Sequence, residues 1–391
     1  MTSAPANIKG NWSYPTQIIF GPGQISKLAQ ACKSLGMTRP LLVTDPGLAA
    51  LPMVRDAIAA NEAAGLPTGL FSDVKPNPVG KNVTDGVAVY KAGDHDGVIA
   101  FGGGSGLDAA KAIALMAGQT RPLWDFEDVG ANWQRADPDG IAPIVAVPTT
   151  AGTGSEVGRA SVIVQEDTHT KKIIFHPKML PGVVISDPEL TLGLPPHITA
   201  ATGMDALAHN LEAYCAPGYH PMADGIAVEG TRLVKEFLPR AVAEGSDIEA
   251  RANMMAAASM GATAFQKGLG AIHSLSHPIG AIYDSHHGLT NAVMMPYVLV
   301  FNRPAIEDKM PRLAAWLGLK HHSYTGILDW VLGLRADLKI PHGLDGLGVD
   351  DSRAAEICEM AAVDPTAGTN PIPLDPINLR QIFDAALAGR V

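Results

Sequence analysis

The residues whose types and spacing could do chemistry most directly lie between Asp205 and His287. Asp205 and His209 are four residues apart in GMDALAHNLEAY, a segment with a helical pattern, so both side chains should leave the same helix face. His273 and His277 repeat this spacing in GAIHSLSHPIGA. Two such pairs indicate a site rather than isolated helix-face histidines, although each histidine taken alone would fit an ordinary structural role.

The donor types suggest which ion such a site would hold. With His286 and His287 added, the named residues offer one aspartate carboxylate and five imidazoles. One carboxylate and three imidazoles suit Fe(II) or Zn(II), whereas Ca or Mg favours more oxygen ligands and a structural zinc finger favours thiolates. The sequence therefore predicts a transition-metal site.

A second group of residues could bind a nucleotide. In GVIAFGGGSGLDAAKAIAL, residues Gly102, Gly103, Gly104 and Ser105 lie between an apolar run and a helical pattern. Backbone without side chains can approach a pyrophosphate there, and a helix N-terminus favours its charge. Leu107 occupies the place of the third glycine of G-x-G-x-x-G and no GK[ST] follows, so neither the usual dinucleotide fingerprint nor a Walker loop applies. A tight strand-to-helix turn remains the alternative.

Asp45 supports a dinucleotide over other nucleotides. In VTDPG it directly follows an apolar run. A carboxylate at the carboxyl end of a strand can accept hydrogen bonds from ribose hydroxyls and repel a 2′-phosphate, which favours NAD over NADP. The alternative is an aspartate that only starts an Asp-Pro-Gly turn.

The predicted metal ligands and nucleotide-binding residues need helices and strands that position them. In the first half, short apolar runs closed by Gly, Pro or Asp alternate with Ala-rich helical segments such as 107–116, the pattern of a parallel α/β sheet. The predicted strands are residues 40–44, 69–71, 97–101, 144–148 and 183–187. From residue 195 onward strand patterns almost vanish, and residues 200–216, 222–237 and 248–265 are predicted helices. We therefore expect an α/β nucleotide-binding domain at 1–192 and an all-helical domain at 193–391.

Composition sets limits on the class of protein. A chain of 391 residues with 47% hydrophobic residues is long enough for two cores. The 29 basic and 39 acidic residues give a net charge of −10, which disfavours nucleic acid as a partner. No signal peptide or membrane-length apolar run is evident, so we expect a cytoplasmic protein without a membrane partner. Cys32, Cys215 and Cys358 are expected to be buried, reduced thiols.

Several motifs together resemble one enzyme family. They include FGPG at 20–23, PNP at 76–78, GGGSGLDAAK ending at Lys111, PTTAGTGSEV at 148–157, HSLSHPIGA at 273–281 and TNP at 369–371. In this order they are similar to the iron-containing (group III) alcohol dehydrogenases, and the resemblance covers nearly the whole chain. It implies a dehydroquinate-synthase-like fold with an N-terminal nucleotide-binding domain and an all-helical C-terminal domain.

The resemblance also implies roles for individual residues. Asp205, His209, His273 and His287 match the four metal ligands, and His277 matches the catalytic histidine beside the nicotinamide and the substrate oxygen. His286 has no matching role. The residues that match cofactor contacts are Asp45, Asn77, Gly103, Gly104, Ser105, Asp108, Thr149, Thr150, Thr153 and Lys171. A slip of one residue would exchange Lys171 with Lys172.

The expected activity is that of a metal-dependent, NAD(H)-linked alcohol dehydrogenase or aldehyde reductase, an oxidoreductase that is a homodimer. A divalent metal would act as a Lewis acid on the alcohol, and His277 would relay the proton or only position the substrate. The substrate stays open between short primary alcohols and a carboxylate-bearing alcohol such as 4-hydroxybutyrate, which Arg159 could pair with. Fe(II) and Zn(II) also remain alternatives.

Two other functions compete with this one. The first is a glycerol-dehydrogenase-like or other enzyme on the dehydroquinate synthase fold, against which the set of one Asp and three His argues. The second is a catalytically silent NAD-binding protein, against which an intact ligand set argues. An assay of nicotinamide reduction with mixed alcohols distinguishes both from an active alcohol dehydrogenase.

Overall fold

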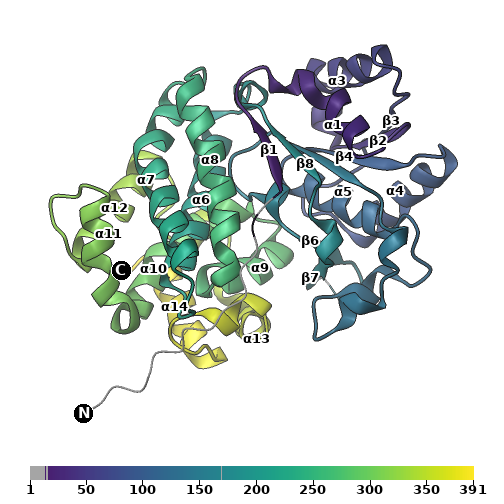
Figure 1. The fold of residues 1–391 in the computed structure, drawn as a ribbon. Helices are drawn as coiled ribbons and strands as arrows, with labels where there is room; N and C mark the ends of the chain where they lie inside the picture. Colours follow the sequence, from purple (N-terminus) through teal and green to yellow (C-terminus); the bar gives the residue numbers. More distant parts are fainter. Residues whose placement is uncertain (1–13, 15, 169) are drawn as a thin grey trace. The chain divides into compact units, whose positions relative to one another are not determined.

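The computed structural model describes residues 14, 16–168 and 170–391, which form two compact units (Figure 1). The strand unit holds residues 16–195 together with Glu244–Met255. The helical unit holds Tyr14, Pro196–Ala243 and Ala256–Val391. The functional division expected at residues 192 and 193 stays a prediction.

A six-stranded parallel sheet organises the strand unit. Its order is β1-β8-β5-β4-β2-β3, and all of its paired strands are parallel. The strands are β1 (Gln17–Phe20), β2 (Pro40–Val43), β3 (Gly69–Phe71), β4 (Gly97–Gly102), β5 (Ile144–Pro148) and β8 (Val183–Ser186). The five predicted strands and the parallel α/β class are confirmed, whereas the edge strand β1 was not predicted.

Helices cover this sheet and explain why its central strands are apolar throughout. Alternate strand residues, among them Leu42, Ile99 and Val145, share one core cluster with Leu28 and Val54 of flanking helices. Burial on both faces removes the usual alternation of polar and apolar residues. The helices are α1 (Leu28–Ser34), α2 (Pro46–Ala49), α3 (Pro52–Ala63), α4 (Gly80–Ala92) and α5 (Gly104–Met116).

The strand order places a topological switch point between β2 and β4. From β2 the chain continues to β3 on one side, whereas β4, β5 and β8 follow one another on the other side. In open parallel sheets, ligands bind outside the carboxyl ends of the strands at such a point. Asp45 directly follows β2 and Gly103 directly follows β4, so the expected cofactor residues begin at this location.

A separate two-stranded hairpin follows β5. Strands β6 (Ala160–Gln165) and β7 (Thr170–Phe175) are antiparallel, with Lys171 opposite Val164. The hairpin is tied to the loop before α4 by a hydrogen bond from Val164 N to Pro78 O, 2.8 Å long. This element was not predicted, and it carries Lys171.

Helices alone form the second unit. No strand occurs in residues 196–391, all of which the structure describes. The helices are α6 (Pro196–Cys215), α7 (Pro221–Ala243), α8 (Ile248–Ala264, which begins in the strand unit), α9 (Ala271–Tyr283), α10 (His287–Ile306), α11 (Met310–Trp316), α12 (Tyr324–Asp337), α13 (Ala354–Ala362) and α14 (Pro376–Ala388). The three predicted helices correspond to α6, α7 and α8. α6 is buried around almost its whole circumference because α7 and α10 both pack on it.

The three cysteines are buried and free of disulfide bonds, as predicted. Burial is the main cause that raises the pKa of Cys32 and Cys215 to about 12 and that of Cys358 to about 11. All three thiols are therefore protonated near neutral pH, which makes them poor nucleophiles.

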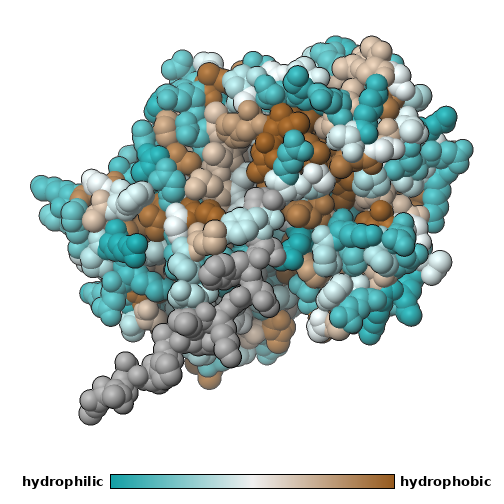
Figure 2. Space-filling model, in the orientation of Figure 1, coloured by the Kyte–Doolittle hydropathy of each residue, from teal (hydrophilic) through white to brown (hydrophobic). Residues whose placement is uncertain are grey.

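The exposed surface is mixed in polarity. Figure 2 shows hydrophilic side chains over much of the visible face, interrupted by apolar patches. Among the described residues, no helix combines the length and the apolar character needed to cross a bilayer.

Candidate metal centre and cofactor site

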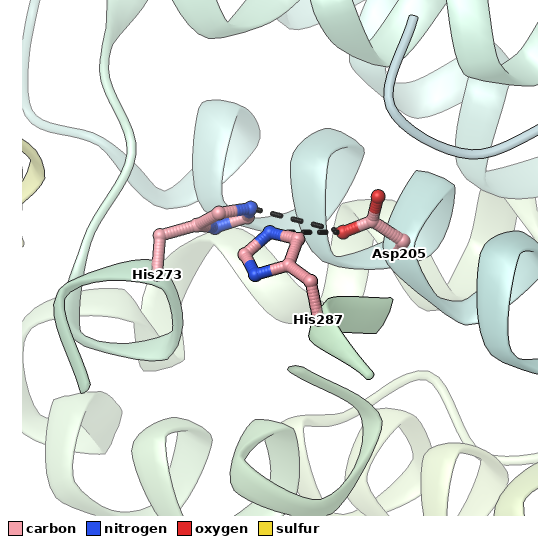
Figure 3. A group of neighbouring side chains, drawn as sticks. All are labelled: Asp205, His273 and His287. Carbon is pink, nitrogen blue, oxygen red and sulfur yellow. Dashed lines mark ion pairs between the residues drawn. The ribbon is translucent and has the colours of Figure 1, made fainter. Parts of the chain in front are cut away.

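Three helices of the helical unit bring the expected metal ligands together. α6 carries Asp205 and His209 one turn apart, α9 carries His273, and α10 begins at His287. Asp205 Oδ1 lies 3.7 Å from His287 Nε2 and 3.9 Å from His273 Nε2 (Figure 3). It lies 4.0 Å from His209 Nε2. Asp205 Oδ1 therefore lies within 4.0 Å of one nitrogen of each of the three histidines, and the assignment of all four residues as ligands of one ion stays a prediction.

The chemistry of this group fits a transition metal. Asp205 is 2% exposed and His273 is also 2% exposed, so their polar atoms have little access to water. A buried carboxylate needs a positive partner, and neutral imidazole nitrogens are suitable ligands for iron and zinc. Asp205, His273 and His287 each offer one ligand atom, and these atoms all lie within 4.8 Å of one another.

A glycine allows α10 to approach α6 at this point. A Cβ atom at Gly288 would collide with the backbone oxygen of Ala201 and lie 3.1 Å from Asp205 Cβ. Because glycine lacks that atom, the start of α10 can lie directly against α6. This contact places the neighbouring residue, His287, beside Asp205.

Glu212 orients His273. Its Oε2 lies 2.5 Å from His273 Nδ1, and its Oε1 accepts a 2.7 Å hydrogen bond from Ile272 N. Burial alone would lower the pKa of His273, but the charges of Glu212, Asp205 and Asp364 raise it above its usual value. In its neutral form, with the Nδ1 proton donated to Glu212, His273 directs Nε2 toward Asp205, the arrangement that metal-binding histidines require.

His277, the expected catalytic histidine, has a carboxylate partner of its own. Its Nδ1 lies 2.8 Å from Asp364 Oδ2. Burial would raise the pKa of Asp364, but His277 and hydrogen bonds from Thr366 lower it below its usual value. The ionised Asp364 therefore fixes the ring through Nδ1, and a role of Nε2 in proton transfer stays a prediction. The ring stacks on that of His287, with centroids 5.4 Å apart.

His286 does not lie beside Asp205 as its neighbour His287 does. It is exposed and caps the N-terminus of α10, where Leu289 N donates to its Nδ1 at 3.4 Å. It is therefore not part of the group around Asp205, in agreement with the absence of a role for it in the resemblance.

The glycine-rich turn and the threonine-rich turn of the strand unit lie against each other. A Cβ atom at Gly103 would lie 3.2 Å from Thr150 Cγ2, and one at Gly104 would lie only 2.5 Å from Thr153 Cγ2. Thr149 N donates to Gly102 O at 2.9 Å. The loops after β4 and β5 thus form one surface of backbone amides and hydroxyls at the N-terminus of α5, suited to a phosphate group.

Asp108 holds these two turns together. Its Oδ1 accepts from Ser155 Oγ at 2.5 Å and pairs with Lys111 Nζ at 3.2 Å, while its Oδ2 accepts from Val162 N at 2.9 Å. Lys111 is buried and also donates to the Ser155 and Ala160 carbonyls. These bonds favour a supporting role for Asp108 in shaping the loop, and a direct cofactor contact by this residue stays a prediction.

Asp45 serves as a helix cap as well as a candidate ribose ligand. Its Oδ1 accepts a 3.0 Å hydrogen bond from Leu48 N at the start of α2. The turn that was considered as the alternative is therefore present, and it holds the carboxylate at the carboxyl end of β2. Capping of α2 by Asp45 is compatible with a hydrogen bond from the same carboxylate to a ribose.

The remaining expected cofactor residues are spread over the same unit. Ser105 lies in the first turn of α5, and Asn77 lies before α4 with a left-handed backbone (φ 51°). Lys172 Nζ pairs with Glu127 Oε1 at 2.8 Å. Because side chains alternate along a strand, Lys171 points to the opposite face of the hairpin from Lys172. Which of the two lysines contacts a cofactor stays a prediction.

Arg159, the expected substrate residue, directly precedes β6. Its guanidinium carbon lies 5.5 Å from the centroid of the Phe175 ring. Burial raises the pKa of Asp128, and the nearby charge of Arg159 acts in the opposite direction. Arg159 is thus partly held by an aromatic ring and by an acidic neighbour.

Three residues of the metal centre were missed in the sequence. Glu212 follows His209 by three residues, and Asn291 follows His287 by four, so helical spacing could have revealed both. Asp364 lies 87 residues from its partner His277, and no local pattern indicates their contact.

Comparison with known proteins gives consistent matches over nearly the whole chain. Residues 15–188 match the family Iron-containing alcohol dehydrogenase, and residues 199–387 match Fe-containing alcohol dehydrogenase family, C-terminal. A 4-hydroxybutyrate dehydrogenase of Cupriavidus necator is 40% identical over 384 residues, which cover 96% of this chain and 99% of the relative. A 1,3-propanediol dehydrogenase of Citrobacter freundii is 36% identical over 95% of this chain and 97% of its own length.

Solved structures agree with the sequence matches. A crystal structure of 1,3-propanediol oxidoreductase has a TM-score of 0.92 at 35% identity and covers 96% of this chain and 99% of its own. A sulfoacetaldehyde reductase of Bifidobacterium kashiwanohense, crystallised with NAD⁺, has a TM-score of 0.87 at 29% identity, covering 97% and 99%. Both similarities extend over the strand unit and the helical unit.

Proposed function

Because the chain belongs to the iron-containing alcohol dehydrogenase family, we propose that it is a metal-dependent, NAD(H)-linked dehydrogenase whose preferred substrate is a small primary alcohol bearing a carboxylate. The observation that carries the reaction class is the convergence of Asp205, His273 and His287 in a buried group. The carboxylate is suggested by the relative named for 4-hydroxybutyrate. The ligand and cofactor assignments are parts of the same proposal.

The proposed ligand residues would hold the metal ion that acts on the alcohol substrate. Asp205, His209, His273 and His287 would hold the ion, which when bound supplies a Lewis acid that eases loss of the hydroxyl proton. Glu212 keeps His273 in the tautomer that offers Nε2. Both Fe(II) and Zn(II) suit this donor set, and elemental analysis of anaerobically purified protein distinguishes them.

His277 handles the proton in this proposal. Because Asp364 accepts at Nδ1, the Nε2 atom is the one that can receive a proton from the alcohol and pass it to water. In the reverse direction the same atom returns a proton to the product alkoxide. The stacking of His277 on His287 keeps the ring close to the ligand group throughout.

The strand unit binds the hydride acceptor. The amides and hydroxyls at the start of α5 and after β5 would bind the phosphates, and Asp45 would bind the adenosine ribose. NAD⁺ held by these groups would supply the acceptor for the hydride of the alcohol carbon. The experiment is an absorbance assay at 340 nm with metal-loaded protein, NAD⁺ and a panel of alcohols. Absence of NADH formation with every alcohol, with iron or zinc loaded, would reject the proposal.

Arg159 is the candidate for binding the substrate carboxylate. If it does, truncation leaves a carboxylate unpaired in a partly desolvated site, which costs about 2–5 kcal/mol, or roughly 30- to 5,000-fold in kcat/KM. We expect Arg159→Ala to lose activity selectively with 4-hydroxybutyrate and to retain it with 1-butanol. Arg159→Lys keeps the charge and serves as the matched control. Equal, small losses with both substrates would leave simple primary alcohols as the better substrate class.

The cell compartment and the oligomeric state complete the proposal. Three buried, unpaired cysteines are typical of a reducing compartment and support a cytoplasmic location. β1 is an edge strand with Phe20 47% exposed, so the sheet offers an edge to a second copy in a homodimer. Sedimentation equilibrium measures the oligomeric state, and a monomer at micromolar concentration would contradict the homodimer.

A further inference from the structure

We propose that Asn291 is a positioning residue of the metal centre, whose side-chain amide holds three ligands in place before an ion binds. This inference rests on the metal-dependent function proposed above. Asn291 Nδ2 donates to Asp205 Oδ1 at 2.7 Å and lies 3.2 Å from His273 Nε2 and 3.1 Å from His287 Nε2. Its side chain is fully buried.

Two of the atoms around the amide would otherwise repel each other. Asp205 Oδ1 is a carboxylate acceptor, and in the neutral tautomer that donates its Nδ1 proton to Glu212, the form that can bind an ion, the Nε2 atom of His273 is an acceptor as well. These acceptors lie only 3.9 Å apart in a region with little access to water. The two N–H groups of an amide are the neutral donors that can satisfy such a group without adding charge. Asn291 therefore keeps the ligands converged at low energetic cost.

The orientation of the amide follows from the same contacts. If nitrogen and oxygen were exchanged, Asn291 Oδ1 would face a carboxylate oxygen at 2.7 Å and two imidazole nitrogens. In the present orientation Oδ1 is buried and has no hydrogen-bond partner among the described residues. A buried acceptor without a partner is unfavourable, so the contacts of Nδ2 with the ligands must outweigh that cost.

Asn302, on the same helix, is a buried asparagine with a purely structural hydrogen-bond pattern and serves as a comparison. It is 4% exposed, and both ends of its amide pair with Asn370, at 2.9 and 2.8 Å. Asn291 instead directs one end of its amide into the ligand group. The contrast separates a residue that fixes the packing of α10 from one that acts on Asp205, His273 and His287.

The position of Asn291 along the helix makes this action direct. It lies one helical turn after His287, so both side chains leave the same face of α10 toward α6. A change at Asn291 should therefore alter how tightly and in what geometry the ligands hold an ion. Partners that orient metal ligands typically contribute 10–100-fold in metal affinity.

The test compares wild type, Asn291→Ala and Asn302→Ala as full-length proteins stripped of metal. Zn²⁺ affinity is measured by competition with a chromophoric chelator, and the visible spectrum of the Co²⁺-loaded proteins reports the coordination geometry. We expect Asn291→Ala to bind Zn²⁺ about 10- to 100-fold more weakly and to show an altered Co²⁺ spectrum. Asn302→Ala should lower the Tm but keep the Zn²⁺ affinity and the Co²⁺ spectrum of wild type. If Asn291→Ala does not fold, Asn291→Ser is measured in the same way.

The possible results separate the inference from the function on which it rests. Wild type that binds neither Zn²⁺ nor Co²⁺ would overturn the proposed metal-dependent function. If wild type binds and Asn291→Ala has the same affinity and spectrum, the inference is wrong while the function stands. Tighter binding by Asn291→Ala would also reject it, since the amide would then compete with the ion. An equal loss in Asn302→Ala would mean that loosening of α10 is responsible.

Discussion

The expected metal ligands lie on helices, whereas the expected cofactor contacts lie mainly on loops that follow strands. Asp205, His273 and His287 start from α6, α9 and α10 and are held by further buried side chains. Gly104 and Thr153 meet where two loops approach each other, and they are only partly buried. The metal centre therefore depends on hydrogen-bonded side chains, and the cofactor site depends on close approach of the backbone.

This difference determines how strongly a single substitution should weaken binding at each site. A side chain removed from the metal centre leaves buried charge without a partner, so a single change should have a large effect. The cofactor site divides its binding over many amides and hydroxyls, so each single change should have a modest effect. Changes in one unit should also leave binding in the other unit intact.

The largest effect is expected when a ligand is removed. His273→Ala and His287→Ala should lose metal affinity by well over ~100-fold, beyond the effect of removing a supporting partner, and should lose activity in parallel. Metal content after dialysis and NADH formation measure both. His286→Ala is the matched control, because that residue caps α10 and lies outside the group of Asp205, His273 and His287. Loss of metal in His286→Ala with retention in His287→Ala would show that the ligands are wrongly assigned.

A smaller but still large effect is expected when Glu212, the hydrogen-bond partner of His273, is substituted. Glu212→Ala removes the acceptor of the Nδ1 proton and should weaken Zn²⁺ binding by about 10- to 100-fold. Glu212→Gln keeps an oxygen acceptor and should lose less. NAD⁺ binding, measured by fluorescence titration, should not change in either variant, and a parallel loss of both ligands would refute the independence of the two sites.

In the strand unit, Asp45 should control the choice of cofactor. Asp45→Asn keeps an oxygen that can accept from Leu48 N but removes the charge that repels a 2′-phosphate. We expect the ratio of kcat/KM for NAD⁺ over NADP⁺ to fall by about tenfold, the equivalent of one charge-dependent hydrogen bond. The Tm should stay near that of wild type. Wild-type protein with equal kcat/KM for the two cofactors would contradict this assignment.

The smallest effect is expected from the contact between the two loops. Gly104→Ala introduces a methyl group 2.5 Å from Thr153 Cγ2, and such overpacking costs about 1 kcal/mol or somewhat more. The KM for NAD⁺ should rise several-fold. The double variant Gly104→Ala/Thr153→Ser removes the opposing methyl group and should recover most of the loss. If the double variant is as impaired as Gly104→Ala alone, the contact is not the cause.

The same contrast explains what the sequence revealed about the site. Helical periodicity linked Asp205 to His209, because residues four apart share a face. The same spacing would have linked His287 to Asn291, which was missed. The contact of His277 with Asp364 joins segments 87 residues apart and has no periodic signal. Thr150 could be assigned only through family motifs, since spacing does not show that its loop meets the glycine-rich turn in space.

The fold was predictable where burial is complete and less so at edges. β2, β4, β5 and β8 are apolar runs because both faces of each strand are covered. β1 has only four residues and exposes both of its ends, so its pattern is weak. The hairpin of β6 and β7 is half-buried, and the run Thr170–Phe175 places two lysines in succession, which breaks the alternation that marks a strand. Likewise, no local sequence pattern predicts that Glu244–Met255 packs with the strand unit.

The burial of the three cysteines has a consequence for how the enzyme would lose activity in air. Their thiols are protonated and screened from solvent, so peroxide and alkylating reagents should react with them slowly. The redox-sensitive component of an iron-loaded protein would then be the ferrous ion itself. Aged enzyme should therefore recover when supplied with fresh Fe(II) under anaerobic conditions, and treatment with a thiol reductant alone should restore nothing.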